Sequence, residues 1–271
     1  MRSIHAAAIQ LHSGTDKASN LAAASTLVRE AAAAGAELVA LPEVFSWRGR
    51  LDEEAGHAEP IPGPTSETMS ALARECGIHL VAGSLLERAE GAERPFNTSV
   101  LFGPDGKALA AYRKIHLFDI DIPGRVTMRE SASRDRGREV ITAETELGRI
   151  GMAICYDLRF PELFRRMSEA GAEIIVMPSA FTRPTGHAHW EPLVRARAIE
   201  NQCFVIAPNQ FGASGGGVDN YGNSLLVDPW GKVLARGADE GAGFVMALLE
   251  AEVLERVRRE LPCLEHRRLE T

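Results

Sequence analysis

Apolar residues in the first third of the chain follow two alternating periods. Residues 4–10, 37–41 and 78–83 form short, almost continuously apolar runs, which is the pattern of buried strands. Residues 16–35 and 64–76 instead mix apolar and polar residues at helical spacing. Strands and helices in this order predict βαβ units, whose strands lie parallel in one sheet.

Single residues mark where these elements begin and end. Asp16 can cap the first helix, and Gly35 offers a left-handed residue at its end. Pro42 stops the strand before it, because proline cannot donate to a strand ladder. The second helix is expected to open at Pro64 and to end at Gly77.

Farther along the chain, turn residues indicate two β-hairpins. Residues 97–114 place two strands around a Pro-Asp-Gly turn, and residues 140–154 are expected to turn at 146–148. The remaining apolar patterns predict helices and single strands. The helices are expected near 160–170, 190–201 and 250–260, and the strands at 174–178, 203–208, 223–229, 232–236 and 243–248.

Two long segments, residues 44–63 and 119–138, show no clear periodicity. Structureless loops of this length are uncommon in compact domains and often carry function. We therefore interpret both as candidate lids over a site, with flexible surface as the alternative.

Two pairs of similar segments divide the chain into related halves. AGAELVALPE at 34–43 resembles AGAEIIVMPS at 170–179, and SVLFGPDGKALA at 99–110 resembles SLLVDPWGKVLA at 224–235. Two such halves, each with helices on one side, would pack sheet against sheet. We predict one domain over residues 1–271 with an α/β fold, a four-layer αββα sandwich built from two similar halves.

Composition and charge exclude several classes of protein. Apolar residues make up 45% of the chain, charged residues 25%, and the net charge is −7, which fits a globular protein. Lys and Arg are scattered, so nucleic acid is not an expected partner. No apolar run approaches the ~20 residues of a membrane helix, and the apolar stretch near the start is too short for a signal-peptide core. We expect a cytoplasmic protein without membrane partners.

The four cysteines show neither a disulfide pattern nor a metal pattern, because no CxxC pair occurs and no histidine stands at metal-ligand spacing. A free cysteine in an apolar strand is usually a small buried hydrophobic residue. Cys155, however, ends an apolar strand and precedes a helix that is expected near Phe160. Such a turn places the side chain at the carboxyl edge of the sheet, beside a helix N-terminus that favours a thiolate. Cys155 is therefore the candidate nucleophile, and no metal is expected.

Glu43 and Lys114 also follow predicted strands, and they supply what a cysteine nucleophile needs. A thiol with an ordinary pKa near 8.5 is only about 3% ionised at pH 7, so it requires a base, and Glu43 is the candidate. A carboxylate beside the thiol raises the thiol pKa, so a cation must offset its charge and stabilise the substrate oxyanion. Lys114 is placed to do both. Taken singly, Glu43 would be interpreted as a solvated loop carboxylate and Lys114 as a surface lysine.

The segments LPEVF around Glu43, YRKIHLFDIDIPG around Lys114 and GMAICYDLRFPELFR around Cys155 resemble the three signatures of the nitrilase superfamily. The resemblance runs over nearly the whole chain. It implies an αββα fold, a homodimer or higher homo-oligomer, and a Glu43, Lys114 and Cys155 triad that needs no cofactor. It also implies that Glu130 helps to position Lys114 and the substrate, and that the Tyr156 backbone N–H joins the oxyanion hole.

The same resemblance suggests a substrate class. Arg159 and Thr185 match positions that hold a substrate carboxylate in the branch of omega-amidases and deaminated-glutathione amidases; a structural ion pair of Arg159 with Asp157 or Glu162 is the alternative. The implied reaction is hydrolysis of a small carboxylate-bearing amide to acid plus ammonia. Asn223 departs from the pattern, because relatives usually have His there, and it is expected to alter local hydrogen bonding and substrate preference.

Other functions stay open at this point. The same three groups could hydrolyse a nitrile, and a non-catalytic α/β binding module could keep the scaffold alone. A Cys-His hydrolase would instead use His116, His187 or His189 as its base. Nucleotide binding is disfavoured, because neither GxGxxG after a strand nor GxxxxGK[ST] occurs.

Overall fold

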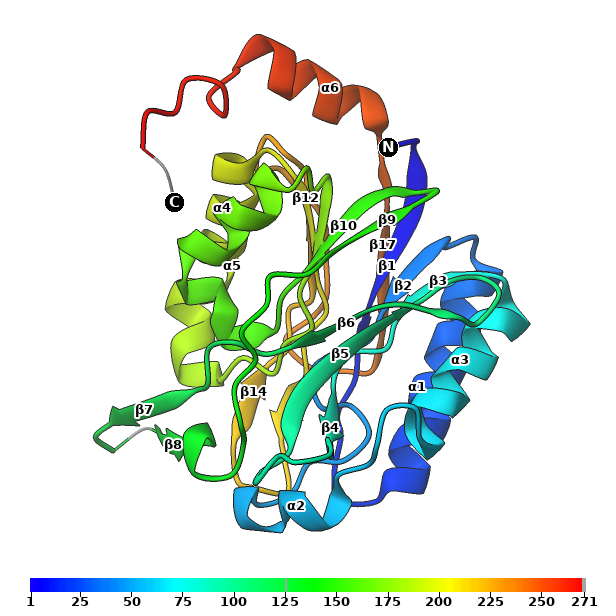
Figure 1. Cartoon of the computed structure of the whole chain (residues 1–271), viewed down its shortest axis with the longest axis vertical. Helices are drawn as coiled ribbons and strands as arrows, with labels where there is room; N and C mark the ends of the chain where they lie inside the picture. Colours follow the sequence, from blue (N-terminus) through cyan, green and yellow to red (C-terminus); the bar gives the residue numbers. More distant parts are fainter. Residues whose placement is uncertain (125, 270–271) are drawn as a thin grey trace.

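Two β-sheets lie face to face between two layers of helices (Figure 1). α1 (Lys17–Ala33) and α3 (Pro64–Cys76) cover the outer face of one sheet. α4 (Pro161–Glu169) and α5 (Arg183–Asn201) cover the outer face of the other. α6 (Ala251–Glu260) follows the last strand. The predicted αββα sandwich is confirmed.

The computed structural model describes residues 1–124 and 126–269, and within them one sheet has seven strands and the other six. The first sheet contains β1 (Ile4–Gln10), β2 (Leu38–Ala40), β3 (His79–Val81), β4 (Leu85–Glu87), β5 (Phe96–Phe102), β6 (Ala108–Arg113) and β17 (Gly243–Leu249). The second contains β9 (Thr142–Thr145), β10 (Gly148–Met152), β11 (Ile174–Val176), β12 (Phe204–Ala207), β15 (Leu225–Val227) and β16 (Val233–Arg236).

The two sheets repeat one arrangement. β1, β2 and β3 are parallel to one another, as are β10, β11 and β12. Each trio pairs on one side with an antiparallel hairpin, β5–β6 or β15–β16, and on the other with an antiparallel strand, β17 or β9. The similar sequence segments fall on β2 and β11 and on the two hairpins. The prediction of two related halves is therefore confirmed.

Alternate residues of β1 face different layers. Ala6 and Ala8 lie in the core between the sheets, whereas Ala7 and Ile9 lie in the cluster under α1 and α3. Successive strand residues point to opposite faces, so a strand that is buried on both faces must be apolar at nearly every position. This accounts for the continuous apolar run at residues 4–10.

The predicted helix boundaries hold for α1 and α3. The Asp16 carboxylate accepts a hydrogen bond from the Ser19 backbone N–H at 3.2 Å and caps α1. Pro64 opens α3, and Gly77 ends it in the left-handed region with φ +65°.

α5 begins at Arg183, earlier than the predicted residue 190. Gly186 disfavours a helix in this segment, which is why the predicted start was too late, although Pro184 in the first turn is compatible with a helix. Gly186 is required for packing rather than for flexibility, because a Cβ there would lie 2.3 Å from Cγ of Tyr221. Tertiary contact thus overrides local propensity.

The two segments without periodicity contain short elements that the sequence did not predict. Residues 44–63 form η1 (Leu51–Glu53) and α2 (Glu54–His57), and residues 119–138 form the hairpin β7 (Asp119–Ile122) and β8 (Val126–Arg129) followed by η2 (Glu130–Ala132). The glycine-rich segment adds the hairpin β13 (Phe211–Ala213) and β14 (Asp219–Tyr221). These strands are only three or four residues long and partly polar, so their pattern is weak.

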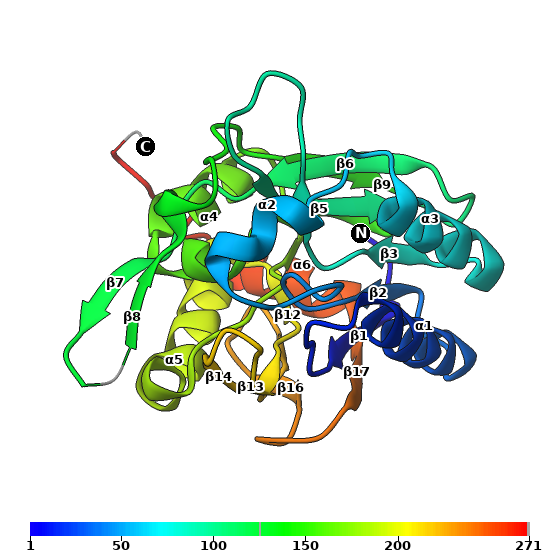
Figure 2. The ribbon, with the colours of Figure 1, turned by 90° about the horizontal axis from the view of Figure 1, so that it is seen from below.

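These short elements gather at one end of the molecule. β7, β8, α2 and β14 lie at the lower end of Figure 1 and face the viewer in Figure 2, which is seen from below. No helix in the described parts of the chain is both long enough and apolar enough to cross a bilayer.

Candidate active site

Glu43, Lys114, Cys155 and Glu130 line one cavity of about 150 Å³. Glu43 follows β2, Lys114 follows β6, Cys155 opens η3 (Cys155–Arg159) after β10, and Glu130 opens η2. Strand ends of both sheets therefore deliver the chemical groups to one place. The prediction that these side chains converge is confirmed.

Two strained backbone positions aim the strand ends into this cavity. Val44, directly after Glu43, has φ +46°, and Cys155 has φ +45°. Residues with a Cβ rarely adopt this left-handed region, which costs of order 1 kcal/mol or more unless the surroundings enforce it. The Val44 N–H donates to Ser84 Oγ at 2.9 Å, and the Cys155 N–H donates to the Pro178 carbonyl at 2.9 Å. These hydrogen bonds stabilise the left-handed backbone at Val44 and at Cys155.

Lys114 lies between two carboxylates inside the protein. Its Nζ donates to Glu43 Oε1 at 2.8 Å and to Glu130 Oε2 at 2.9 Å, and all three side chains are buried. Asn97 Nδ2 also donates to Glu43 Oε1 at 2.8 Å. Burial lowers the pKa of Lys114, but Glu130 and Glu43 outweigh burial and raise the pKa above its ordinary value. Lys114 therefore stays an ammonium.

A second cation, Arg134, completes a buried ion network. It donates to Glu130 Oε1 at 2.7 Å and, through two nitrogens, to both carboxylate oxygens of Glu54 at 2.8 and 2.6 Å. Burial raises the pKa of Glu130, but Lys114 and Arg134 outweigh it and lower the pKa to about 2. Neither Arg134 nor Glu54 was predicted from the sequence as a site residue. The signal for Arg134 was its place four residues after Glu130.

The effects on the pKa of the Cys155 thiol combine differently from those on Lys114 and Glu130. Burial and the neighbouring Glu43 carboxylate raise its pKa well above the ordinary value, against the opposing effects of Lys114 and the Ala180 backbone N–H. The expectation that a helix N-terminus would favour the thiolate is therefore outweighed. At neutral pH the resting sulfur is a protonated thiol.

Asp157 braces the Lys114 strand against the Cys155 turn. Its buried carboxylate accepts from Tyr112 Oη at 2.7 Å and from the Ile154 N–H at 2.9 Å. It also accepts from the His116 N–H at 3.1 Å, and its Oδ1 lies 2.7 Å from His116 Nδ1. Tyr112 and His116 stand on either side of Lys114 in the chain, so Asp157 fixes Lys114 relative to Cys155.

Comparison with known proteins shows the family. Residues 5–259 match the family model for carbon-nitrogen hydrolases. The human deaminated glutathione amidase is 45% identical over 97% of this chain and 81% of its own length, and the human omega-amidase is 40% identical over 99% and 96%. The chain belongs to the carbon-nitrogen hydrolase family. It is an amidohydrolase acting on carbon-nitrogen bonds other than peptide bonds.

Solved structures agree with this placement. The NitFhit protein of C. elegans superposes with a TM-score of 0.92 and 38% identity over 99% of this chain and 66% of that longer one. A mutant amidase from Nesterenkonia sp. AN1, with a TM-score of 0.80 and 26% identity over 96% of this chain and 98% of its own, has acrylamide added to its active-site cysteine.

The three residues expected to bind substrate lie around the hydrolase cavity rather than in its lining. Tyr156 follows Cys155 at the start of η3, where the first backbone N–H groups have no partner within the helix. Arg159 is partly exposed, with Nη1 3.3 Å from His189 Nδ1. Thr185 Oγ1 is 2.8 Å from Oγ1 of Thr182, which lines the cavity. Their roles stay predictions.

The alternative interpretation of Arg159 as a structural ion pair is not supported, because no ion pair joins it to Asp157 or Glu162 in the described residues. Its guanidinium instead lies over the rings of Tyr156 and Phe181, at 5.8 and 5.3 Å from their centroids.

No histidine among the described residues lines the hydrolase cavity, which argues against a Cys-His pair. His116 is held by Asp157, and His187 packs against the Tyr221 ring. Asn223 also lies outside the cavity lining. Its Oδ1 accepts from Arg236 at 2.7 and 2.9 Å, and its φ of +55° is one that asparagine tolerates. An effect of Asn223 on substrate preference therefore stays a prediction.

Both segments interpreted as lids contribute to the cavity wall. Arg48, Gly49, Leu51 and Glu54 come from the first, and Thr127, Met128 and Glu130 from the second. The glycine-rich segment adds Ser214, Gly216 and Val218. In the part of the chain that the structure describes, no group of three or more His, Cys, Asp or Glu side chains could hold a metal.

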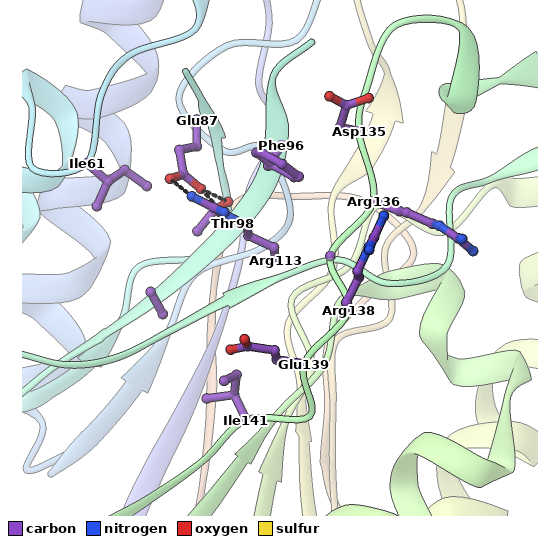
Figure 3. Close-up of a pocket in the computed structure, with 12 residues that line it drawn as sticks. Ile61, Glu87, Phe96, Thr98, Arg113, Asp135, Arg136, Arg138, Glu139 and Ile141 are labelled. Atoms are coloured by element: carbon purple, nitrogen blue, oxygen red, sulfur yellow. Dashed lines mark hydrogen bonds and ion pairs between the residues drawn. The ribbon is translucent and has the colours of Figure 1, made fainter. Parts of the chain in front are cut away.

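A larger hollow of about 780 Å³ lies elsewhere on the hydrolase (Figure 3). Its lining includes Phe96, Arg113, Glu87 and Arg138. Arg113 donates to both carboxylate oxygens of Glu87, at 2.8 and 2.6 Å, so its guanidinium is already engaged. Among the described residues that line this hollow there is no cysteine.

Proposed function

We propose that this hydrolase cleaves small carboxylate-bearing amides, such as omega-amides of 2-oxo acids or deaminated glutathione, with Cys155 as nucleophile. The observation that carries the proposal is that the buried Glu43 carboxylate accepts from Lys114 Nζ at 2.8 Å and lines the same small cavity as the Cys155 thiol. The names of the two human relatives support the substrate class. The cysteine adduct of the Nesterenkonia amidase supports the nucleophile.

The protonation states assign the roles. Lys114 stays charged, so it cannot take a proton and instead stabilises negative charge on the substrate oxygen. The Cys155 thiol is protonated at rest, so attack requires a base. Glu43 contacts Lys114, lines the same cavity as Cys155 and raises the pKa of its thiol, so it is the carboxylate that takes the thiol proton.

The first half of the cycle forms a thioester. As Glu43 removes the proton, the Cys155 sulfur bonds to the amide carbon and the carbonyl oxygen becomes an oxyanion. Lys114 and the Tyr156 backbone N–H stabilise that charge. The carbon–nitrogen bond then breaks, Glu43 returns the proton to the nitrogen, and ammonia or an amine leaves.

The second half restores the enzyme. Glu43 removes a proton from water as the water oxygen attacks the thioester carbon, and the carbon–sulfur bond breaks. The sulfur regains a proton from Glu43, and the carboxylic acid leaves. Glu130 keeps Lys114 in place throughout, because it binds both Lys114 and Arg134.

Two measurements test the proposal. Amide hydrolysis is assayed as acid formed from a panel of 2-oxoglutaramate, deaminated glutathione, neutral amides and nitriles, and the acidic amides are expected to react fastest. Acid quenching during turnover should leave the acyl group on the Cys155 peptide, detectable by mass spectrometry. Hydrolysis that survives in Cys155→Ala, or nitriles reacting faster than every amide, would refute the proposal.

We also propose that the hydrolase forms a homodimer through the outer face of α5. Trp230 is 63% exposed and Ile199 45% exposed, and exposed apolar side chains that adjoin one another are typical of interaction surfaces. The two adjoin through Gly231, whose Cβ position lies 2.5 Å from Ile199 Cδ1. A hollow of about 530 Å³ lined by residues of α5, among them Ile199, lies on the same helix.

A further inference from the structure

One cation of the active-site cavity has no partner. The charged residues that line the cavity are Glu43, Glu54, Glu130, Lys114, Arg134 and Arg48. Lys114 and Arg134 donate to all three of the carboxylates. Arg48 makes no side-chain hydrogen bond or ion pair within the described residues, and its Nε is shielded from solvent.

Arg48 as a whole is half-buried, but its Nε costs free energy where it lies, because burial removes water from this atom without supplying an acceptor. Arg48 lines the same cavity as Glu43, Glu54 and Cys155, so it shares the space of the reacting groups. Each of those carboxylates already accepts from another cation. An incoming anion would therefore be the acceptor that Arg48 lacks.

The backbone around Arg48 is held firmly. Trp47 is buried, and its ring stacks on His57 with centroids 3.9 Å apart. The Arg48 N–H donates to the Gly14 carbonyl at 2.9 Å. A Cβ on Gly49 would lie 2.4 Å from the Trp47 ring, so this turn needs glycine. Arg48 is thus carried on a rigid wall and not on a free loop.

The glycine-rich segment packs directly on this wall. A Cβ on Gly215 would lie 2.8 Å from the Arg48 carbonyl oxygen, and one on Gly216 would lie 2.6 Å from the Gly49 carbonyl oxygen. The two segments can approach this closely only because the second has no side chains there. Both segments line the cavity, so together they enclose the space in front of Arg48.

We infer that Arg48 binds the carboxylate of the substrate and sets the preference for acidic amides, an inference that rests on the proposed function. The planar guanidinium can hold a carboxylate through two parallel hydrogen bonds. The amide carbon lies at Cys155 and the carboxylate at Arg48, both in one cavity of about 150 Å³. A cavity of this size suits the monoamide of a short dicarboxylic acid.

Arg159, the arginine singled out from the sequence, is differently placed. It does not line the cavity, it lies over two aromatic rings, and its Nη1 is near His189. Arg48 lines the same cavity as Cys155, and it would lose no hydrogen bond or ion pair to a described residue when it binds a carboxylate. We therefore expect substitution of Arg48 to reduce the preference for acidic amides more than substitution of Arg159.

The test compares two amides that differ at one end. Succinamate ends in a carboxylate, and butyramide ends in a methyl group at the same place. We expect Arg48→Ala to lower the ratio of kcat/KM for succinamate over butyramide on the order of 10- to 100-fold, mainly through KM. Arg48→Lys should restore part of the ratio, because lysine keeps the charge but not the fork.

Arg50→Ala is the matched control. Arg50 lies two residues away, is exposed, and pairs with Asp52 at 2.8 Å, so its removal should leave the ratio as it is. The inference is overturned if Arg48→Ala keeps the ratio, if both amides lose rate equally, or if Arg159→Ala lowers the ratio more than Arg48→Ala does.

A binding measurement separates this inference from the proposed function. Calorimetry gives the Kd of succinamate for Cys155→Ala with and without Arg48→Ala. Weakening by at least about tenfold supports the carboxylate contact even if the wild-type enzyme hydrolyses neither amide, a result that would refute the proposed function alone. Equal Kd values overturn the inference even if the enzyme is an active amidase.

Discussion

Lys114 and Cys155 both keep a proton at neutral pH. In many cysteine enzymes the sulfur is instead a thiolate that pairs with a neighbouring cation. Glu130 and Glu43 raise the pKa of Lys114 against burial, and burial and Glu43 raise the pKa of the Cys155 thiol. The Glu43 carboxylate thus raises the pKa of both groups. It secures the ammonium that will stabilise the oxyanion, and it prevents the thiolate from forming before the substrate arrives.

Glu43→Gln should separate these two effects of the carboxylate. Hydrolysis should fall on the order of 10²- to 10⁴-fold, because the general base is gone. The pKa of Cys155 should also fall, because the removed negative charge had been raising it. The pH midpoint of Cys155 alkylation by iodoacetamide, followed by mass spectrometry, should therefore move to lower pH.

Cys76 is the internal control for that titration. It lies on α3, and the charged groups that affect its thiol are Glu75 and Arg29, so its own midpoint should not move. A Cys155 midpoint that stayed in place or rose would contradict the electrostatic account of Glu43.

At the scale of elements, the β6 exit and the η3 turn act as one unit because Asp157 joins them. The carboxylate receives hydrogen bonds from Tyr112 and from the Ile154 N–H, and it holds His116 as well. The strand that carries Lys114 is therefore tied to the turn that carries Cys155. Asp157 does not line the cavity, so it is a positioning residue.

Asp157→Asn should disturb this unit while keeping its volume. Asparagine turns an N–H₂ donor toward groups that are themselves donors, so the free energy of unfolding should fall by about 2 kcal/mol. The kcat should fall on the order of 10-fold or more with KM much less affected, because Lys114 shifts relative to the reacting carbon. Urea unfolding and steady-state kinetics measure the two effects.

Tyr112→Phe provides a graded comparison, since it removes one donor and leaves the carboxylate. It should show a smaller loss in both measurements. If Asp157→Asn lost stability but kept kcat, the brace would be structural only.

Those helices and strands were predictable from the sequence whose pattern of apolar residues extends over enough positions to show its period. Glu43, Lys114 and Cys155 could be predicted for the same reason, because each lies within three residues of the end of such a strand. Arg134 and Glu54 were not, because they lie in segments whose short elements are fixed by contacts with distant residues. Periodicity carries no information about such contacts.

At the scale of the whole molecule, neither half of the sandwich holds a complete site. Glu43 and Lys114 extend from strands of the first sheet, and Cys155 from the second. The buried apolar layer between the sheets therefore sets the distance between base and nucleophile. β17, supplied by the far end of the chain, pairs with β1 over seven residues and ties the first sheet to the second half.

The matching hairpin turns of the two halves carry different residues at an exposed position. The turn of the β5–β6 hairpin carries Asp105, which pairs with Lys107, and the matching turn of β15–β16 carries Trp230. A tryptophan that is 63% exposed replaces a charged residue at an equivalent turn. The outer face of the second half thus carries two exposed apolar side chains, Trp230 and Ile199, beside the charged Glu191, Arg195 and Arg236. An apolar centre with a polar rim is typical of an interface between two copies.

Trp230→Glu tests the proposed dimer. If two copies meet through Trp230 and α5, a twofold interface contains each residue twice, so the substitution introduces two charges and the Kd for dimerisation should rise on the order of 100-fold. Sedimentation velocity across a concentration series measures this shift. Asp105→Ala, at the equivalent turn of the other half, should leave the mass distribution unchanged. A wild-type chain that sediments as a monomer at all concentrations, or a Trp230→Glu variant that dimerises as tightly as wild type, would rule this interface out, because the argument depends on Trp230 being covered in solution.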